Sequence, residues 1–184
     1  ADAHVYDIPM ICVIETMGRH AGWLAAASAL AAYKGKGPDL IYLPEVDFDL
    51  DLLVEDVRKV FDEKKQVVVV VSEGVSTKEG KFIPELVGDV SVDSFGHKQL
   101  GGAASVLANY LKDKFNCKVR GIEFSLMQRC AAHVASATDI EEAYLAGQVA
   151  VQKAIEGMSD HMVGFVRAPG KEYKCEIKMI PLAE

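Results

Sequence analysis

Five consecutive valines, Val67–Val71, constrain the fold of this chain more than any other feature of its sequence. A β-strand with one face in water alternates apolar and polar residues, whereas a strand covered on both faces is apolar throughout. The valine run is therefore typical of a strand inside a sheet that helices cover on both sides. The 184 residues, half of them hydrophobic, are enough for one domain with a substantial core.

Strand-like and helix-like segments alternate on either side of this run. We expect strands at residues 10–14, 40–43, 67–71, 119–124, 161–167 and 173–180. We expect helices at residues 19–33, 50–62, 100–114 and 139–156, the last of them capped by Asp139. This order predicts an α/β domain with a mostly parallel sheet, in a Rossmann-like three-layer arrangement.

Two further features bear on the organisation of the chain. Residues 74–99 are polar, irregular and rich in Gly and Asp, which predicts an inserted loop or lid. The chain starts at Ala1 just ahead of a strand and stops at Glu184 without a capping signal. We therefore expect a piece of a longer protein, although processing can also remove a first residue.

Charge and cysteine content exclude several classes of protein. The formal net charge of −7 argues against nucleic-acid binding, which requires a basic face. The four cysteines have neither a CxxC pair nor zinc-type spacing, so we interpret them as reduced thiols of a cytoplasmic protein. The longest apolar stretches are too short to span a bilayer, and neither a membrane segment nor a metal site is expected.

Candidate ligand-binding residues follow the predicted strands, because ligands of such sheets bind beyond the carboxyl ends of the strands. Gly18 and Arg19 stand where the first strand gives way to a helix. A helix start offers N–H groups to an anion, glycine permits close approach, and arginine grips phosphate with two hydrogen bonds. This pattern indicates a phosphate or sugar-phosphate site, and a tight turn with a solvated arginine is an equally weighted alternative.

Three more residues after strands are candidates. Glu73 follows the valine run after Ser72 and can accept hydrogen bonds from sugar hydroxyls, or else cap a helix or form a loop salt bridge. Arg129 can add a second cationic contact to phosphate. His133 shares a face with Arg129 if this segment is helical, but an isolated histidine is more often structural.

Taken together, these segments resemble the phosphofructokinase family. The resemblance rests on four motifs, each at a strand end and in the same order: "VIETMGRHAGWLAAASAL", "DLIYLPEVDF", "VVVVVSEGVS" and "VRGIEFSLMQR". Order and spacing agree over most of residues 10–167. The resemblance implies the phosphofructokinase fold, present here in part.

The resemblance also implies roles for individual residues. Met17, Gly18 and Arg19 would hold fructose 6-phosphate, Glu73 would bind its hydroxyls, and Arg129 would contact its phosphate. The family's "QRGGSPxxYDR" is replaced here by "QRCAAHVASATDIEEA", so its last arginine is absent, and His133 is the candidate to compensate. This variant is more similar to the pyrophosphate-using branch than to the ATP-using bacterial enzymes.

Two other departures concern the active site of the family. An arginine that reaches a neighbouring subunit's substrate is often found where this chain has Met10. The catalytic Asp pair and the "GGDG" donor loop lie upstream of the matched segments and do not occur in this chain. The resemblance therefore implies no catalytic residue here, and it places the Mg²⁺ and donor sites in the missing half.

We therefore interpret residues 1–184 as the C-terminal, substrate-binding portion of a phosphofructokinase, with residues 157–184 returning toward the missing N-terminal half. The parent enzyme would transfer a phosphoryl group from pyrophosphate or ATP, with Mg²⁺, to O1 of fructose 6-phosphate in glycolysis. The piece alone is expected to be inactive. A homo-oligomer is implied by the resemblance only. The alternative is a non-catalytic sugar-phosphate sensor or assembly module of the same fold.

Overall fold

The structure, a computed structural model, describes residues 8–86 and 102–183. The chain divides into two compact units, Ala1–Cys130 and Ala131–Glu184, and each is described by itself. The larger unit carries the valine strand and most of the predicted site. The smaller unit consists of a helix and a hairpin.

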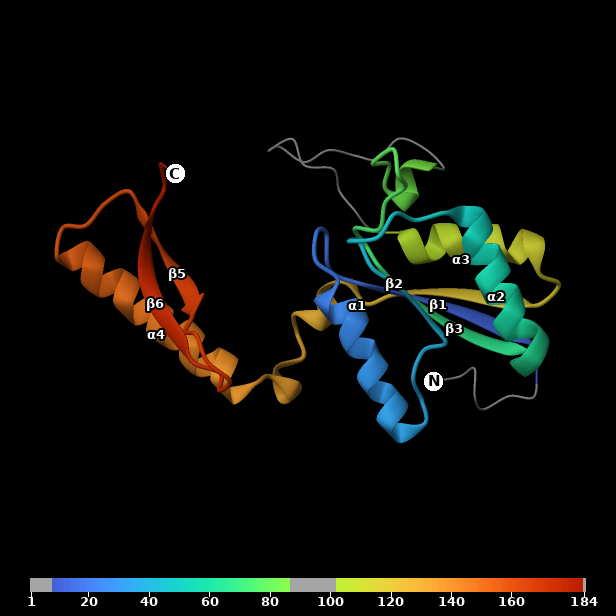
Figure 1. Ribbon diagram of the computed structural model, residues 1–184, viewed down its shortest axis with the longest axis horizontal. Coiled ribbons are helices and arrows are strands. Elements are labelled where there is room, and N and C mark those ends of the chain that lie inside the picture. The colour runs from blue at the N-terminus through green and yellow to red at the C-terminus, as the bar shows by residue number, and fades with distance from the viewer. Residues whose placement is uncertain (1–7, 87–101, 184) are drawn as a thin grey trace. The chain divides into compact units, whose positions relative to one another are not determined.

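A four-stranded parallel sheet forms the centre of the larger unit (Figure 1). Its strands lie in the order β2 (Leu40–Tyr42), β3 (Gln66–Ser72), β1 (Met10–Thr16) and β4 (Lys118–Glu123). All three pairings are parallel, with β1 between β3 and β4. The predicted α/β fold with a mostly parallel sheet is confirmed, and the four strands predicted within this unit are present.

Helices cover both faces of this sheet (Figure 1). Helices α2 (Leu50–Lys64) and α3 (Ala103–Lys114) pack on one face, and the short α1 (Trp23–Ala27) lies on the other. The valine run contributes side chains to the packing on both faces of the sheet, because successive side chains of a strand point to opposite faces. The larger core contains alternate valines of β3 together with leucines and a valine from α2 and α3: Val67, Val69, Val71, Leu53, Val57, Leu107 and Leu111. The opposite face contributes a smaller cluster of Met10, Val68 and Ile14.

The helix predicted at residues 19–33 begins later than expected. The first helical residue is Trp23, and the five-residue α1 passes into a 3₁₀ helix, η2 (Ser28–Lys34), which ends at Gly35 in a left-handed conformation. A loop occupies the preceding residues because Gly18, with φ of 141°, departs from helical geometry. The chain therefore needs residues 17–22 to pass from the end of β1 into the helix.

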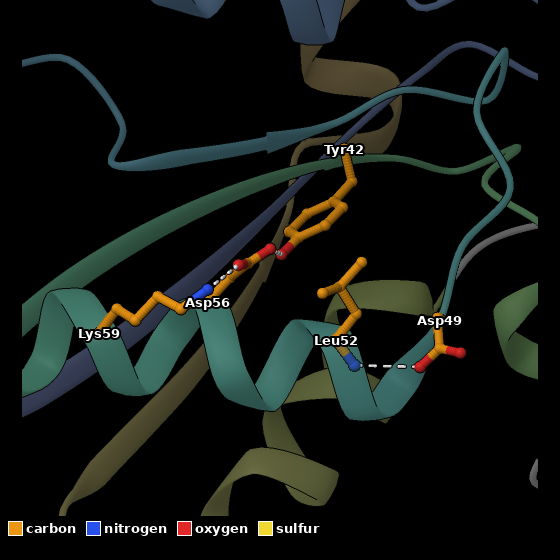
Figure 2. Close-up of polar contacts among 5 residues, drawn as sticks. All are labelled: Tyr42, Asp49, Leu52, Asp56 and Lys59. Carbon is orange, nitrogen blue, oxygen red and sulfur yellow. Dashed lines mark hydrogen bonds and ion pairs between the residues drawn. The ribbon is translucent and has the colours of Figure 1, made fainter.

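Helix α2 is held at its start and along its length by side chains (Figure 2). The Asp49 carboxylate accepts hydrogen bonds from the backbone N–H groups of Asp51 and Leu52, at 2.8 and 3.0 Å. The Tyr42 hydroxyl of β2 donates to Asp56 at 3.2 Å, and Lys59 pairs with the same carboxylate. These contacts cap α2 and fix it against the edge strand.

The predicted inserted loop, residues 74–99, is described only as far as residue 86. That part begins with a turn closed by a bridge between Ser76 and Phe82 and continues into η3 (Ile83–Leu86). Val75 and Ile83 are fully buried in the larger core, so this part packs against the domain. The rest of the predicted loop, together with the first residues of the helix predicted at 100–114, lies outside the described residues.

The segment after β4 is not one helix. It forms two separate 3₁₀ turns, η4 (Ser125–Gln128) and η5 (Ala132–Val134), which belong to different units. The condition for Arg129 and His133 to share a helical face is therefore not met. Short 3₁₀ turns replace the helix because Ser125 has a left-handed φ of 42° and the chain is extended again at Ala135.

The smaller unit contains α4 (Ala137–Ile155) and an antiparallel hairpin of β5 (His161–Arg167) and β6 (Cys175–Pro181). Helix and hairpin were expected, but the cap is different. Ser136, and not Asp139, is the N-cap, since its hydroxyl accepts a hydrogen bond from the Asp139 N–H at 3.3 Å. Asp139 instead places its charge in the first turn, where the helix dipole favours an acid.

Two findings bear on the cysteines and on the membrane segments that the sequence analysis considered. The four cysteines are free thiols. Within residues 8–86 and 102–183, the helices are all too short or too polar to traverse a lipid bilayer.

The Asp49 cap gives a stability prediction. Asp49→Ala should lower the free energy of unfolding by about 1 kcal/mol, because two N–H groups of α2 lose their acceptor. Urea denaturation measures the change. Asp47→Ala, which removes an exposed carboxylate two residues earlier, should change it by less than about 0.5 kcal/mol. Equal losses for the two variants would contradict the capping role.

Candidate functional site

The register of the sheet brings three strand ends together. Glu15 of β1 lies opposite Val71 of β3 on one side and Glu123 of β4 on the other, so the three strands end almost level. The residues that follow, beginning with Met17, Glu73 and Phe124, therefore emerge side by side at the carboxyl edge. This is the edge where ligands bind in sheets of this kind.

Glycines allow the loops after β1 and β3 to touch. A Cβ atom on Gly74 would lie 1.8 Å from the carbonyl oxygen of Arg19, which leaves no room for a side chain. At Gly18 a Cβ atom would lie 2.5 Å from the carbonyl oxygen of Ala21, and φ is 141°. The Gly74 N–H and the Ser72 hydroxyl both donate to the Gly18 carbonyl. These two glycines thus allow one loop to pack on the other.

An open pocket of about 520 Å³ lies at this edge. Its lining comes from the loop after β1, the start of α1, the end of β3 and η4, and comprises Met17, Gly18, Arg19, Ala21, Trp23, Leu24, Glu73, Gln128 and Arg129. Five of the six residues predicted from the sequence are thereby brought into one cavity. Arg19 and Arg129 line the same pocket, although more than a hundred positions separate them in the chain.

His133, the sixth predicted residue, belongs to the smaller unit. It lies in η5, and its side chain is exposed. Its role toward a ligand stays a prediction.

Side chains of the protein accept hydrogen bonds from three backbone amides between β1 and α1. The N–H of Met17 donates to the Gln128 side chain at 2.8 Å, and the N–H of Gly18 donates to Glu73 at 3.2 Å. The Gly22 N–H, just before α1, donates to Glu45 at 2.8 Å. The protein itself therefore satisfies these three groups. The pocket's attraction for an anion therefore depends mainly on the arginine side chains.

Three contributors to the site were missed from the sequence. Gln128 precedes Arg129 directly, so the "QR" pair was the available signal, but only the arginine was considered. Trp23, 81% exposed, places an indole at the pocket through its position at the start of α1. Glu45 holds Gly22 from the "PE" turn after β2, a long-range contact that no local pattern reveals.

A smaller, acidic cavity of about 200 Å³ adjoins the pocket and shares Met17 and Glu73 with it. Glu15, buried at its side, accepts a hydrogen bond from the Ala104 N–H at 2.9 Å. Burial raises the pKa of the Glu15 carboxyl group above its usual value, against the lowering effect of the Ala104 N–H, and Glu123 and Glu73 raise it further. This cavity is therefore unfavourable for a negatively charged ligand, which the larger pocket accommodates better.

Comparison with profiles of known protein families shows to which family this chain belongs. The profile described as Phosphofructokinase matches residues 2–122, which is well over half of the chain. This chain belongs to the phosphofructokinase family.

Individual relatives within the phosphofructokinase family agree. The chain is 38% identical to a pyrophosphate–fructose 6-phosphate 1-phosphotransferase of Halomonas elongata, covering 97% of this chain and 44% of that protein. It is 42% identical to the protein of the same name from Xanthomonas campestris, covering 94% and 41%. The solved structure of a pyrophosphate-dependent phosphofructokinase from Marinobacter aquaeolei matches with a TM-score of 0.71 at 33% identity, covering 97% and 40%. The chain thus spans less than half the length of these relatives.

The buried Glu15 gives a prediction on pH dependence. An unfolded Glu15 ionises near its usual pKa of 4.5, whereas the folded protein holds the proton to higher pH. Wild-type stability should therefore fall as pH rises between these two pKa values. Glu15→Gln keeps an oxygen for the Ala104 N–H and removes the ionisation. Its free energy of unfolding relative to wild type should thus be larger at about pH 7.5 than at about pH 4.

Urea denaturation at the two pH values measures this difference. Glu55→Gln, an exposed change on α2, is the matched control, and it should change the free energy of unfolding by less than about 0.5 kcal/mol. A pH-independent difference for Glu15→Gln would show that burial of this carboxyl group does not affect its ionisation.

Proposed function

We propose that this chain is the sugar-phosphate-binding portion of a 6-phosphofructokinase that uses pyrophosphate as its phosphoryl donor, in glycolysis in the cytoplasm. The observation that carries the proposal is the pocket at the carboxyl edge of the sheet, which Arg19, Glu73 and Arg129 line together. Two cationic groups and one carboxylate suit a ligand with a phosphate at one end and hydroxyl groups at the other. The names of the relatives from Halomonas and Xanthomonas support both substrates.

Each residue has a defined part in this proposal. Arg19 and Arg129 neutralise the phosphate of fructose 6-phosphate, and Met17 and Gly18 form the adjoining wall. Glu73 accepts a hydrogen bond from a sugar hydroxyl with the oxygen that does not bind the Gly18 N–H. Phosphoryl transfer depends on placing donor and acceptor together, so these residues bind and orient the acceptor.

The donor side of the reaction is assigned to no residue of this chain. Within residues 8–86 and 102–183, no three Glu, Asp, His or Cys side chains form a group that suits a metal ion. No described side chain is therefore assigned to the Mg²⁺ that the family resemblance implies. Mg²⁺ would accompany the donor, where it would neutralise phosphate charge. The family resemblance also implies a homo-oligomer, so the proposal includes association of several copies of the chain.

The protein expressed from its complete gene can be assayed with pyrophosphate and ATP in parallel, at varied fructose 6-phosphate. Transfer from pyrophosphate is expected. Binding of fructose 6-phosphate without turnover on either donor would favour a sugar-phosphate sensor of the same fold. Absence of both binding and turnover would overturn the proposal.

The arginines give the quantitative prediction. Arg129→Ala and Arg19→Ala should each raise the KM for fructose 6-phosphate roughly 10- to 150-fold, since a hydrogen bond to a charged group contributes about 1.5–3 kcal/mol. Lys112→Ala removes an exposed cation near the end of α3, outside the pocket, and should leave the KM unchanged. An unchanged KM in both arginine variants would contradict the assigned roles.

A further inference from the structure

Gln128 links the two loops that carry the arginines. It is the last residue of η4, directly before Arg129, and it lines the same pocket. Its Oε1 atom accepts a hydrogen bond from the N–H of Met17, the first residue after β1, at 2.8 Å. A single side chain from one loop therefore fixes the backbone of the other at the point where it enters the pocket.

This hydrogen bond also determines how the amide group is oriented. The Met17 N–H is a donor, so only the oxygen of the Gln128 amide can face it. The two N–H donors of Nε2 must then point away from Met17. No hydrogen bond from Nε2 to any residue in the described parts of the chain is present. The side chain is half-buried at the pocket, so these donors are available to a ligand there.

The N–H donors of Gln128 Nε2 complement the other groups that line the pocket. Arg19 and Arg129 provide charged donors, and Glu73 provides an acceptor. An uncharged donor beside Arg129 can satisfy an oxygen lone pair that the arginines do not reach, without adding charge. A buried acceptor on the ligand would otherwise lose its hydrogen bond to water without replacement.

We propose that Gln128 has two roles: Oε1 holds the Met17 loop in place, and Nε2 donates a hydrogen bond to an oxygen of the bound sugar phosphate. The proposal rests on the proposed function and adds a binding and positioning residue to it. The two roles belong to opposite ends of one amide group, so they can be separated by substitution.

Two variants of Gln128 separate them. Gln128→Glu keeps an oxygen to accept from the Met17 N–H but replaces the donor with a negatively charged acceptor that repels phosphate. It should raise the KM for fructose 6-phosphate about ten-fold or more, with a smaller effect on kcat. Gln128→Met keeps the length of the side chain and loses both functions, so kcat should fall as well, because the Met17 loop is released. Thermal unfolding of each variant confirms that it folds.

Met127→Glu is the matched control for charge. Met127 precedes Gln128, its side chain is exposed, and it lines none of the cavities described above, so the same charge is added just outside the pocket. Its KM should stay within about two-fold of wild type, because water and salt screen an exposed charge. The assays use the protein expressed from its complete gene, with its preferred donor at saturation.

The outcomes distinguish this inference from the proposed function. A wild-type KM for Gln128→Glu would show that the amide only holds the loop, and equal KM increases for Met127→Glu and Gln128→Glu would show an effect of charge alone. Either result overturns the ligand contact. If Arg129→Ala raises the KM while Gln128→Glu does not, the proposed function stands and the role of Gln128 fails. If fructose 6-phosphate is neither bound nor used by the wild-type protein, both fail.

Discussion

The parallel pairing of β1 with β3 and β4 is the constraint on which the site depends. Because the three strands end almost level, three loops leave the sheet beside one another, and residues far apart in the sequence become neighbours. The five valines of β3 are all buried, so apolar packing on both faces holds this strand at the centre of the unit. The side chains of Arg19 and Arg129 can therefore line one pocket at the carboxyl edge of the sheet.

Within this frame, the loops hold one another by backbone contact and by side-chain hydrogen bonds. The Met17 and Gly18 amides are bound by Gln128 and Glu73, each from a different loop. Such a network orders the pocket before a ligand arrives, which lowers the entropy lost on binding. Glu73 and Gln128 each bind a backbone N–H with one polar atom of the side chain. In the proposals above, the other polar atom of each side chain contacts the ligand.

The sequence predicted the architecture and most of the pocket, for physical reasons that differ. Val67–Val71 fixed a buried strand by composition alone, and the polar residues after each strand followed from the rule for parallel sheets. The prediction was wrong where local pattern competes with loop geometry: the helix expected from Arg19 starts at Trp23, and the N-cap of α4 is Ser136. Gln128 and Glu45 act through contacts distant in sequence, which periodicity and propensity do not encode.

The tight contact at Gly74 has a consequence for how this pocket can diversify. Gly74 does not line the pocket, yet any larger residue there would collide with the backbone that presents Arg19. We therefore expect variation in ligand preference at exposed lining positions such as Trp23 and Leu24, and not at Gly74. A deep mutational scan would thus find Gly74 intolerant of substitution, although it does not line the pocket.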